Sequence, residues 1–147
     1  MVNRGLATDL DRSGSFVTLF LGRIDLVTGD VRFIDASHGL ALMRRANGRV
    51  EPLRGPQGLP LGAELDSVYG EGQTRLDRDD TLLISSDGLP DARPDLGSVS
   101  AHLGPYLEER SARTLVERLL RLADDAGERP DDLTMVAVRR LEGMLAA

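Results

Sequence analysis

The chain has 147 residues, a net charge of −6 and no cysteine, and all 18 of its basic residues are arginine. A chain of this length buries about 68–70% of its unfolded surface, so we expect one domain spanning residues 1–147 with a real core. The acidic balance argues against a general nucleic-acid binder, and the absence of cysteine excludes disulfides and thiolate metal sites. No apolar run approaches the ~18–20 residues of a membrane span, and no signal peptide precedes the strands, so we expect a cytoplasmic protein without a membrane partner.

The first half of the sequence predicts a short helix followed by strands joined by tight turns. Leu6 and Leu10 stand at i,i+4 spacing, which predicts helix within residues 2–10. The β-branched and aromatic run from Phe16 to Asp25 predicts a strand that pairs as a hairpin with the next. The other strands expected here are 31–36, 40–45 and 49–53, with turns at Thr28-Gly29-Asp30 and Asn47-Gly48. Residues 55–62, rich in Gly and Pro, are predicted to be connection only.

The second half predicts two further strands, one confident helix and a closing strand. Residues 66–75 predict a strand, and the nearly continuous apolar run 81–86 predicts a buried central one. Residues 90–97 are expected to be irregular, and 98–109 are ambiguous. Residues 111–125 predict a helix capped by Ser111 and stopped by Gly127 and Pro130, before a last strand over 133–141. Hairpin-linked strands and segregated helices predict an α+β fold with antiparallel sheets, a β-sandwich flanked by helices.

Two acidic motifs stand at the ends of predicted strands. Asp87-Gly88 follows the buried strand 81–86, and Asp131-Asp132 precedes the last strand. Carboxylate oxygens suit a hard divalent cation, and Gly88 would let its backbone carbonyl or a water approach closely. Each motif also has a plainer interpretation, as a strand-ending turn for Asp87-Gly88 and as an exposed acidic loop for Asp131-Asp132. Taken singly, each motif favours the plainer interpretation.

Other candidate residues carry weaker signals. His38 stands near a hairpin without a second nearby histidine, so it predicts a hydrogen-bonded structural residue rather than a zinc ligand or a base. Ser37, Ser85 and Ser86 lack the Gly-x-Ser-x-Gly pattern of a hydrolase nucleophile. The loop 55–62 lacks the Lys-Ser/Thr of a phosphate-binding loop.

Taken in order, the motifs resemble those of the metal-dependent protein phosphatase (PPM) family, in its SpoIIE-like branch. The ordered set spans about residues 2–141, and its most specific members surround the two acidic motifs. Asp80 to Gly88 is similar to the family's Asp-x-Leu-hydrophobic-Tyr-Thr-Asp-Gly step, and Asp131-Asp132-Leu133-Thr134 to its closing motif. The remaining matches are Phe16 to Phe20, Thr28-Gly29, Ala36-Ser37-His38, Gly58 to Gly62 and Asp91-Ala92-Arg93.

The resemblance implies a fold, a reaction and a set of site residues. Members of the family remove phosphate from phosphoserine or phosphothreonine, with two Mn²⁺ or Mg²⁺ ions that activate a water. Asp87 and Asp131 would be the catalytic metal ligands, together with Gly88. The substrate would be a phosphorylated regulatory protein such as an anti-sigma-factor antagonist.

The same resemblance predicts an incomplete site. The family's N-terminal hairpin and helix, with the acids that bridge the two metals, have no counterpart here, so we expect an N-terminally truncated domain. Two carboxylates are few for a cation that takes six oxygens. An uncovered aliphatic sheet face would favour self-association. The alternatives are a pseudophosphatase or protein-binding module that keeps the fold, and a small α+β domain in which both acidic motifs are turns.

Overall fold

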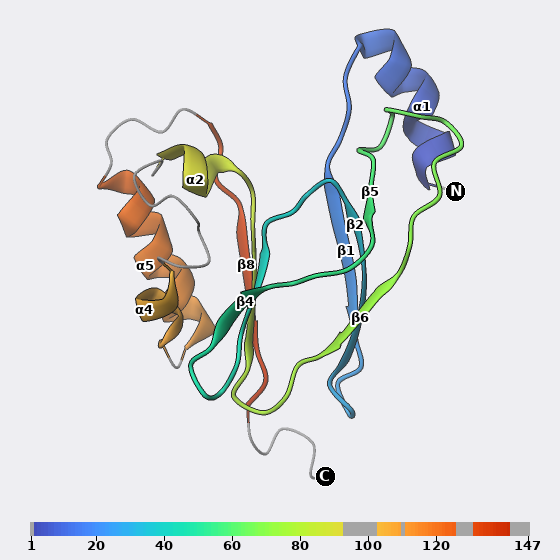
Figure 1. The fold of residues 1–147 in the computed structure, drawn as a ribbon. Helices are drawn as coiled ribbons and strands as arrows, with labels where there is room; N and C mark the ends of the chain where they lie inside the picture. The colour runs from blue at the N-terminus through green and yellow to red at the C-terminus, as the bar shows by residue number, and fades with distance from the viewer. Residues whose placement is uncertain (1, 93–102, 110, 126–130, 142–147) are drawn as a thin grey trace. The chain divides into compact units, whose positions relative to one another are not determined.

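The computed structural model describes residues 2–92, 103–109, 111–125 and 131–141 (Figure 1). The chain divides into two compact units. Unit 1 is Met1–Gly39 with Arg54–Arg75, and unit 2 is Leu40–Leu53 with Leu76–Ala147. The prediction of one domain over residues 1–147 stays a prediction.

Unit 1 is a four-stranded sheet with one helix. Its elements are α1 (Val2–Ser13), β1 (Leu19–Ile24), β2 (Asp30–Ala36), β5 (Gln57–Gly58) and β6 (Gly72–Arg75). β1 and β2 form the predicted antiparallel hairpin, with Leu19 opposite Ala36 and Ile24 opposite Val31. Gly29, in the connecting turn, has φ +83°, a left-handed conformation that costs glycine nothing. The helix expected over 2–10 is confirmed and continues to Ser13.

The pairing along the second edge of β2 differs from two of the predictions. Residues 55–62 are not connection only, because β5 pairs in parallel with β2, Gln57 opposite Asp35 and Gly58 opposite Ala36. β6 then has only residues 30–33 of β2 left to pair with. The strand predicted over 66–75 is therefore wrong for 66–71, which make no ladder, and right for Gly72–Arg75. The competition of two segments for one strand edge is invisible in either segment alone.

One buried amide fastens α1 to the rest of unit 1. Asn3, 6% exposed, donates through Nδ2 to the carbonyl oxygens of Glu64 and Leu65, at 2.8 and 3.1 Å. Its Oδ1 accepts from the amide of Gly62 at 2.9 Å. A helix of 12 residues is marginal by itself in water, so these contacts with residues some 60 positions away hold its first turn.

Unit 2 is a four-stranded antiparallel sheet with helices against it. Its order is β4 (Val50–Pro52), β3 (Ala41–Arg44), β7 (Thr81–Ser85) and β8 (Met135–Arg139). In the part of unit 2 that the structure describes, the helices are α2 (Gly88–Ala92), α4 (Gly104–Leu107) and α5 (Ala112–Asp124). Figure 1 shows α4 and α5 lying along this sheet. α2 begins where an irregular segment was expected, so that expectation is wrong for residues 90–92; residues 93–97 lie outside the described part.

The core of unit 2 lies between the helices and one face of the sheet. The predicted cap on α5 is confirmed, because Ser111 Oγ accepts from the amide of Thr114 at 3.3 Å. The predicted stop signals Gly127 and Pro130 lie outside the described residues. The fully or nearly buried residues that form the core are aliphatic: Leu42, Leu83, Leu89, Leu103, Leu115, Leu119, Leu122 and Ala123.

Asp80 fixes the start of β7. The carboxylate, 3% exposed, accepts hydrogen bonds from the amides of Ala46 and Asp77 at 2.8 and 3.0 Å and from Arg45 Nη1 at 2.9 Å. Burial lowers the pKa of Arg45, but its hydrogen bonds to Asp80 and Glu51 outweigh burial and hold that pKa above its ordinary value. A buried charge satisfied in this way anchors the entry to the central strand.

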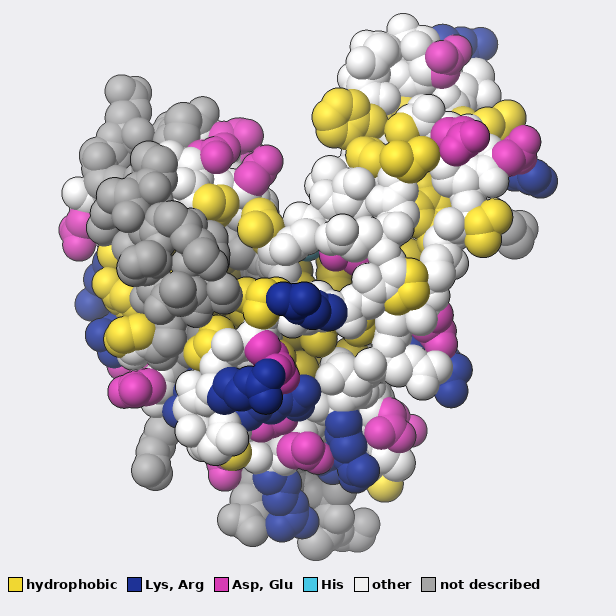
Figure 2. Space-filling view, viewed as in Figure 1, with side chains coloured by type: hydrophobic (Ala, Val, Ile, Leu, Met, Phe, Trp, Pro, Cys, Tyr) yellow, Lys and Arg dark blue, Asp and Glu magenta, His cyan; other side chains and the backbone are white. Residues whose placement is uncertain are grey.

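The architecture confirms the α+β class, and among the described strands every pair except β2 with β5 is antiparallel. Within the described residues, no helix combines the length and apolarity needed to cross a membrane. On the face drawn in Figure 2, basic and acidic side chains are interspersed, and hydrophobic side chains reach the surface between them. Self-association through an uncovered sheet face stays a prediction.

Candidate functional site

The site begins where β7 ends. β7 lies between β3 and β8, and Thr81, Leu82, Leu83 and Ser85 are all buried. The chain leaves β7 at Ser86, exposes Asp87 to solvent and enters α2 at Gly88. The amide of Asp91 donates to the carbonyl of Asp87 at 2.9 Å, so this carbonyl begins the first turn of the helix. A rigid buried strand therefore presents one exposed carboxylate at its end.

Ser86 fastens this turn to the loop that precedes β8. Its amide donates to the carbonyl of Thr134 at 2.9 Å, and its Oγ accepts from the amide of Thr134 at 3.0 Å. The same hydroxyl donates to the carbonyl of Asp132 at 3.3 Å. Sequence reasoning considered Ser86 only as a nucleophile and missed this positioning role. Its place directly after the buried strand, one residue beyond the last laddered pair of Ser85 and Met135, was the available signal.

The backbone position of Gly88 leaves no room for a side chain. A Cβ built on it would be 2.4 Å from the carbonyl oxygen of Asp132 and 3.2 Å from the Cα of Leu133. Glycine is needed here because the two segments touch, backbone against backbone. The prediction that its carbonyl binds a cation stays a prediction.

The two predicted carboxylates thus lie on adjoining segments of unit 2. Asp87 and Asp131 are both exposed. Asp131 Oδ1 accepts from the amide of Asp132 at 2.7 Å, which leaves Oδ2 for another partner. The Asp87 carboxylate makes no hydrogen bond or ion pair with the described residues. Whether either residue binds a metal stays a prediction.

The donors fit a divalent cation in kind but only in part by number. Carboxylate oxygens suit Mn²⁺ or Mg²⁺. In the part of the chain that the structure describes, no group of three or more His, Asp or Glu side chains gathers as a metal site. Two carboxylates would supply part of the oxygen shell of a divalent cation, and water or further ligands would have to complete it.

The segment around His38 belongs to unit 1 and is built by a residue that the sequence did not single out. Asp35, 5% exposed, accepts from the amide of His38 at 2.7 Å and from the amide of Gly39 at 3.2 Å. This cradle holds Ser37 at φ +59°, a strained conformation for a residue with a side chain. The His38 ring lies against Phe20, and its buried Nε2 has no hydrogen-bond partner among the residues that the structure describes. The expected hydrogen bonding of His38 therefore holds for its backbone amide and not for Nε2.

Known proteins resemble this chain over most of its length. The chain matches the family described as Stage II sporulation protein E (SpoIIE) over residues 1–141. Protein IcfG of Synechocystis sp. is 26% identical, over 95% of this chain and 23% of its own length. The chain therefore spans about a quarter of that relative.

Two solved structures share the fold. The phosphatase domain of the cell fate determinant SpoIIE from Bacillus subtilis has a TM-score of 0.72 and 16% identity, over 99% of this chain and 68% of that one. The catalytic domain of the serine/threonine protein phosphatase PstP, in complex with two manganese ions, has a TM-score of 0.67 and 17% identity, over 92% and 65%. At these identities the likeness shows the fold alone. With the family match over nearly its whole length, the chain belongs to the SpoIIE family and has the α+β fold of PPM phosphatases.

Proposed function

We propose that this chain is a metal-dependent serine/threonine phosphatase domain that acts on a phosphorylated regulatory protein in the cytoplasm, such as an anti-sigma-factor antagonist. One observation carries the proposal: Ser86 and Gly88 lock the Asp87 turn against the Asp131–Thr134 loop. Membership of the SpoIIE family supports the reaction class.

Each residue of the site has a distinct task in this proposal. Asp87 and Asp131 hold the cation, Mn²⁺ or Mg²⁺, through carboxylate oxygens that face solvent. When bound, the cation supplies the positive charge that a phosphomonoester dianion and its attacking water require at neutral pH. Ser86 and Gly88 hold the two segments at a fixed spacing, so that both carboxylates are positioned before the cation arrives.

The first test is Mn²⁺-dependent hydrolysis of p-nitrophenyl phosphate and of a phosphoserine protein by the 147-residue chain. We expect Asp87→Asn and Asp131→Asn each to lower activity by about 100-fold or more, because each removes a charged ligand from a sparse set. Asp9→Asn is the matched control, since Asp9 is exposed on α1 in unit 1. Activity that Asp87→Asn leaves unchanged would rule out Asp87 as a ligand.

A second candidate function is a protein-binding module that keeps the fold without catalysis. It is favoured by the observation that the described residues offer no third acidic or imidazole ligand beside Asp87 and Asp131. Calorimetry with Mn²⁺ separates the two functions. Binding of two ions by this chain, abolished by Asp87→Asn, would exclude the second function. No detectable Mn²⁺ binding together with no hydrolysis would exclude the first.

A further inference from the structure

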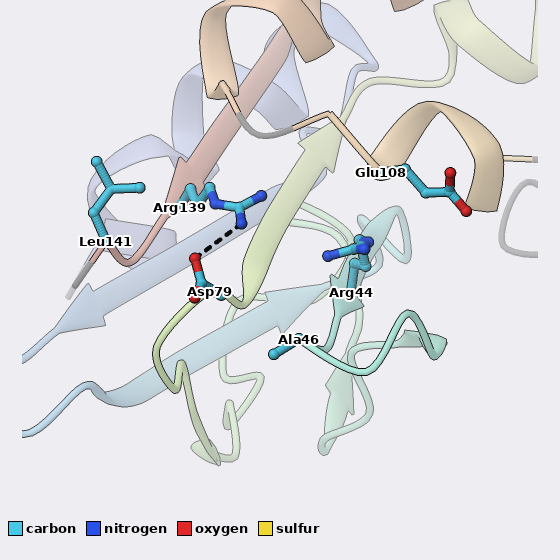
Figure 3. Close-up of a pocket in the computed structure, with 6 residues that line it drawn as sticks. All are labelled: Arg44, Ala46, Asp79, Glu108, Arg139 and Leu141. Atoms are coloured by element: carbon cyan, nitrogen blue, oxygen red, sulfur yellow. Dashed lines mark hydrogen bonds and ion pairs between the residues drawn. The ribbon is translucent and has the colours of Figure 1, made fainter.

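Unit 2 contains a polar cavity at the end of its sheet opposite the Asp87 turn. β7 runs from Thr81, which pairs with Arg139, to Ser85, which pairs with Met135 and precedes the turn. The cavity has a volume of about 590 Å³ and opens at the Arg139 end (Figure 3). It is lined by Arg44, Ala46, Asp79, Glu108, Arg139 and Leu141. The sheet therefore separates this cavity from the proposed metal ligands.

Arg139 forms one wall of the cavity and is already partly satisfied. Its side chain is 10% exposed. Nη2 pairs with Asp79 Oδ1 at 2.9 Å, and Nη1 donates to the carbonyl of Glu109 at 3.0 Å. The remaining donor, Nε, is buried and has no hydrogen-bond partner within the described part of the chain. A buried N–H without an acceptor is unfavourable, so this donor is not yet satisfied by the protein.

Arg44 approaches the cavity from β3, opposite Thr81. Its Nε is likewise buried without a partner, and the side chain makes no ion pair with any residue that the structure describes. In Figure 3, Arg44 and the Asp79–Arg139 pair border the cavity from different strands, and the Glu108 carboxylate is directed away from Arg44. Since Asp79 offsets the charge of Arg139, the charge of Arg44 remains available to a ligand.

We propose that this cavity binds a phosphate group. Guanidinium N–H groups are strong donors to phosphate, and here they come from β3 on one side and β8 on the other. A tetrahedral anion can accept hydrogen bonds from two such directions at once, whereas a planar carboxylate offers its oxygens along one edge. The group could be free inorganic phosphate or belong to a phosphorylated residue; both present the same oxygens.

Calorimetric titration of the whole chain with inorganic phosphate tests the proposal, with EDTA present so that no metal contributes. We expect a dissociation constant of about 1 mM or tighter, weakened by about tenfold or more in Arg44→Gln. Arg113→Gln removes the same charge from an exposed position on α5 and is expected to bind like the unaltered chain. Titration with O-phosphoserine at equal ionic strength distinguishes free phosphate from a phosphorylated residue.

A second variant acts in the opposite direction. Asp79→Asn removes a negative charge from the cavity wall and is expected to tighten phosphate binding severalfold. Asparagine tolerates the left-handed conformation of Asp79, φ +64°, so the loop is preserved. No saturable binding up to about 10 mM phosphate, or equal affinity in Arg44→Gln, Asp79→Asn and the unaltered chain, would overturn the proposal. Asp87→Asn should leave binding unchanged, so this site stands or falls independently of the proposed phosphatase activity.

Discussion

The two units bury their apolar residues to very different degrees. Unit 2 packs helices α2, α4 and α5 on its sheet, with Leu103, Leu115 and Leu119 at 0% exposure. Within the described residues, unit 1 has α1 as its helix and exposes large apolar side chains that include Phe16 at 66%, Leu21 at 56% and Val68 at 92%. Unit 2 also holds both acidic motifs. The more tightly packed unit therefore also carries the candidate metal ligands. We expect substitutions in unit 2 to be more damaging than those in unit 1.

The largest difference is expected between two leucines. Leu119→Ala leaves a cavity among the fully buried residues of unit 2 and should lower the free energy of unfolding by about 2–5 kcal/mol. Leu21→Ala shortens a side chain in unit 1 that is 56% exposed, and it should change the free energy of unfolding by less than about 0.5 kcal/mol. Urea denaturation followed by circular dichroism measures both. Equal effects would mean that the apolar face of unit 1 is covered in solution.

Substitution of one glycine in each unit is also expected to affect stability differently. Gly88→Ala would bring a methyl group to 2.4 Å from the Asp132 carbonyl oxygen, and we expect it to separate the two segments of the site at a cost of about 1–3 kcal/mol. Gly5→Ala meets no atom within 4 Å on α1 and should stabilise that helix by up to about 1 kcal/mol. Denaturation midpoints of the two variants, with Mn²⁺ calorimetry of Gly88→Ala, test this. Unchanged Mn²⁺ binding in Gly88→Ala would show that close approach is not required.

Within unit 1, the attachment of α1 is expected to depend on one residue. Asn3→Ala removes the acceptor of the Gly62 amide and the donor to two carbonyls, which should cost about 1–3 kcal/mol. Arg4→Ala is the neighbouring control, because its ion pair with Asp66 is 72% exposed on both sides and contributes at most about 1 kcal/mol. Hydrogen exchange of the α1 amides reports the loosening directly. Equal exchange in the two variants would exclude Asn3 as the attachment.

The smallest expected effect is one of pH. The amides of Thr28 and Val27 donate to the Asp25 carboxylate and hold its pKa below the ordinary value. Because the folded pKa is depressed, this contribution is present above about pH 3.9 and is lost as the pH falls through the folded value. Stability measured from pH 6 down to about 3 should therefore fall slightly more for the unaltered chain than for Asp25→Asn. If stability falls with pH equally steeply in both proteins, Asp25 does not contribute to the loss of stability in acid.

Sequence reasoning predicted the parts of the molecule that local pattern decides. The β1–β2 hairpin, the buried strand β7, helix α5 with its Ser111 cap and the two acidic motifs follow from alternation, apolar runs and capping residues. It could not predict β5, the start of α2 or the short extent of β6. These features depend on which distant segments pair with the edge of β2 or follow the end of β7 in the folded chain. The roles of Ser86, Asp80 and Asn3 depend on partners that include residues 34 to 62 positions away.

The hydrogen bonds of Ser86 can form only at a late point in the synthesis of this chain. Its partners, Asp132 and Thr134, stand 46 and 48 residues later in the chain. During synthesis from the N-terminus, β3, β4 and β7 are complete well before these residues leave the ribosome. The hydrogen bonds that hold the Asp87 turn against this loop therefore cannot form until residues 132–134 have been synthesised. Until then the nascent chain carries the Asp87 carboxylate without its neighbour, and any activity that needs both begins only once the closing strand is in place.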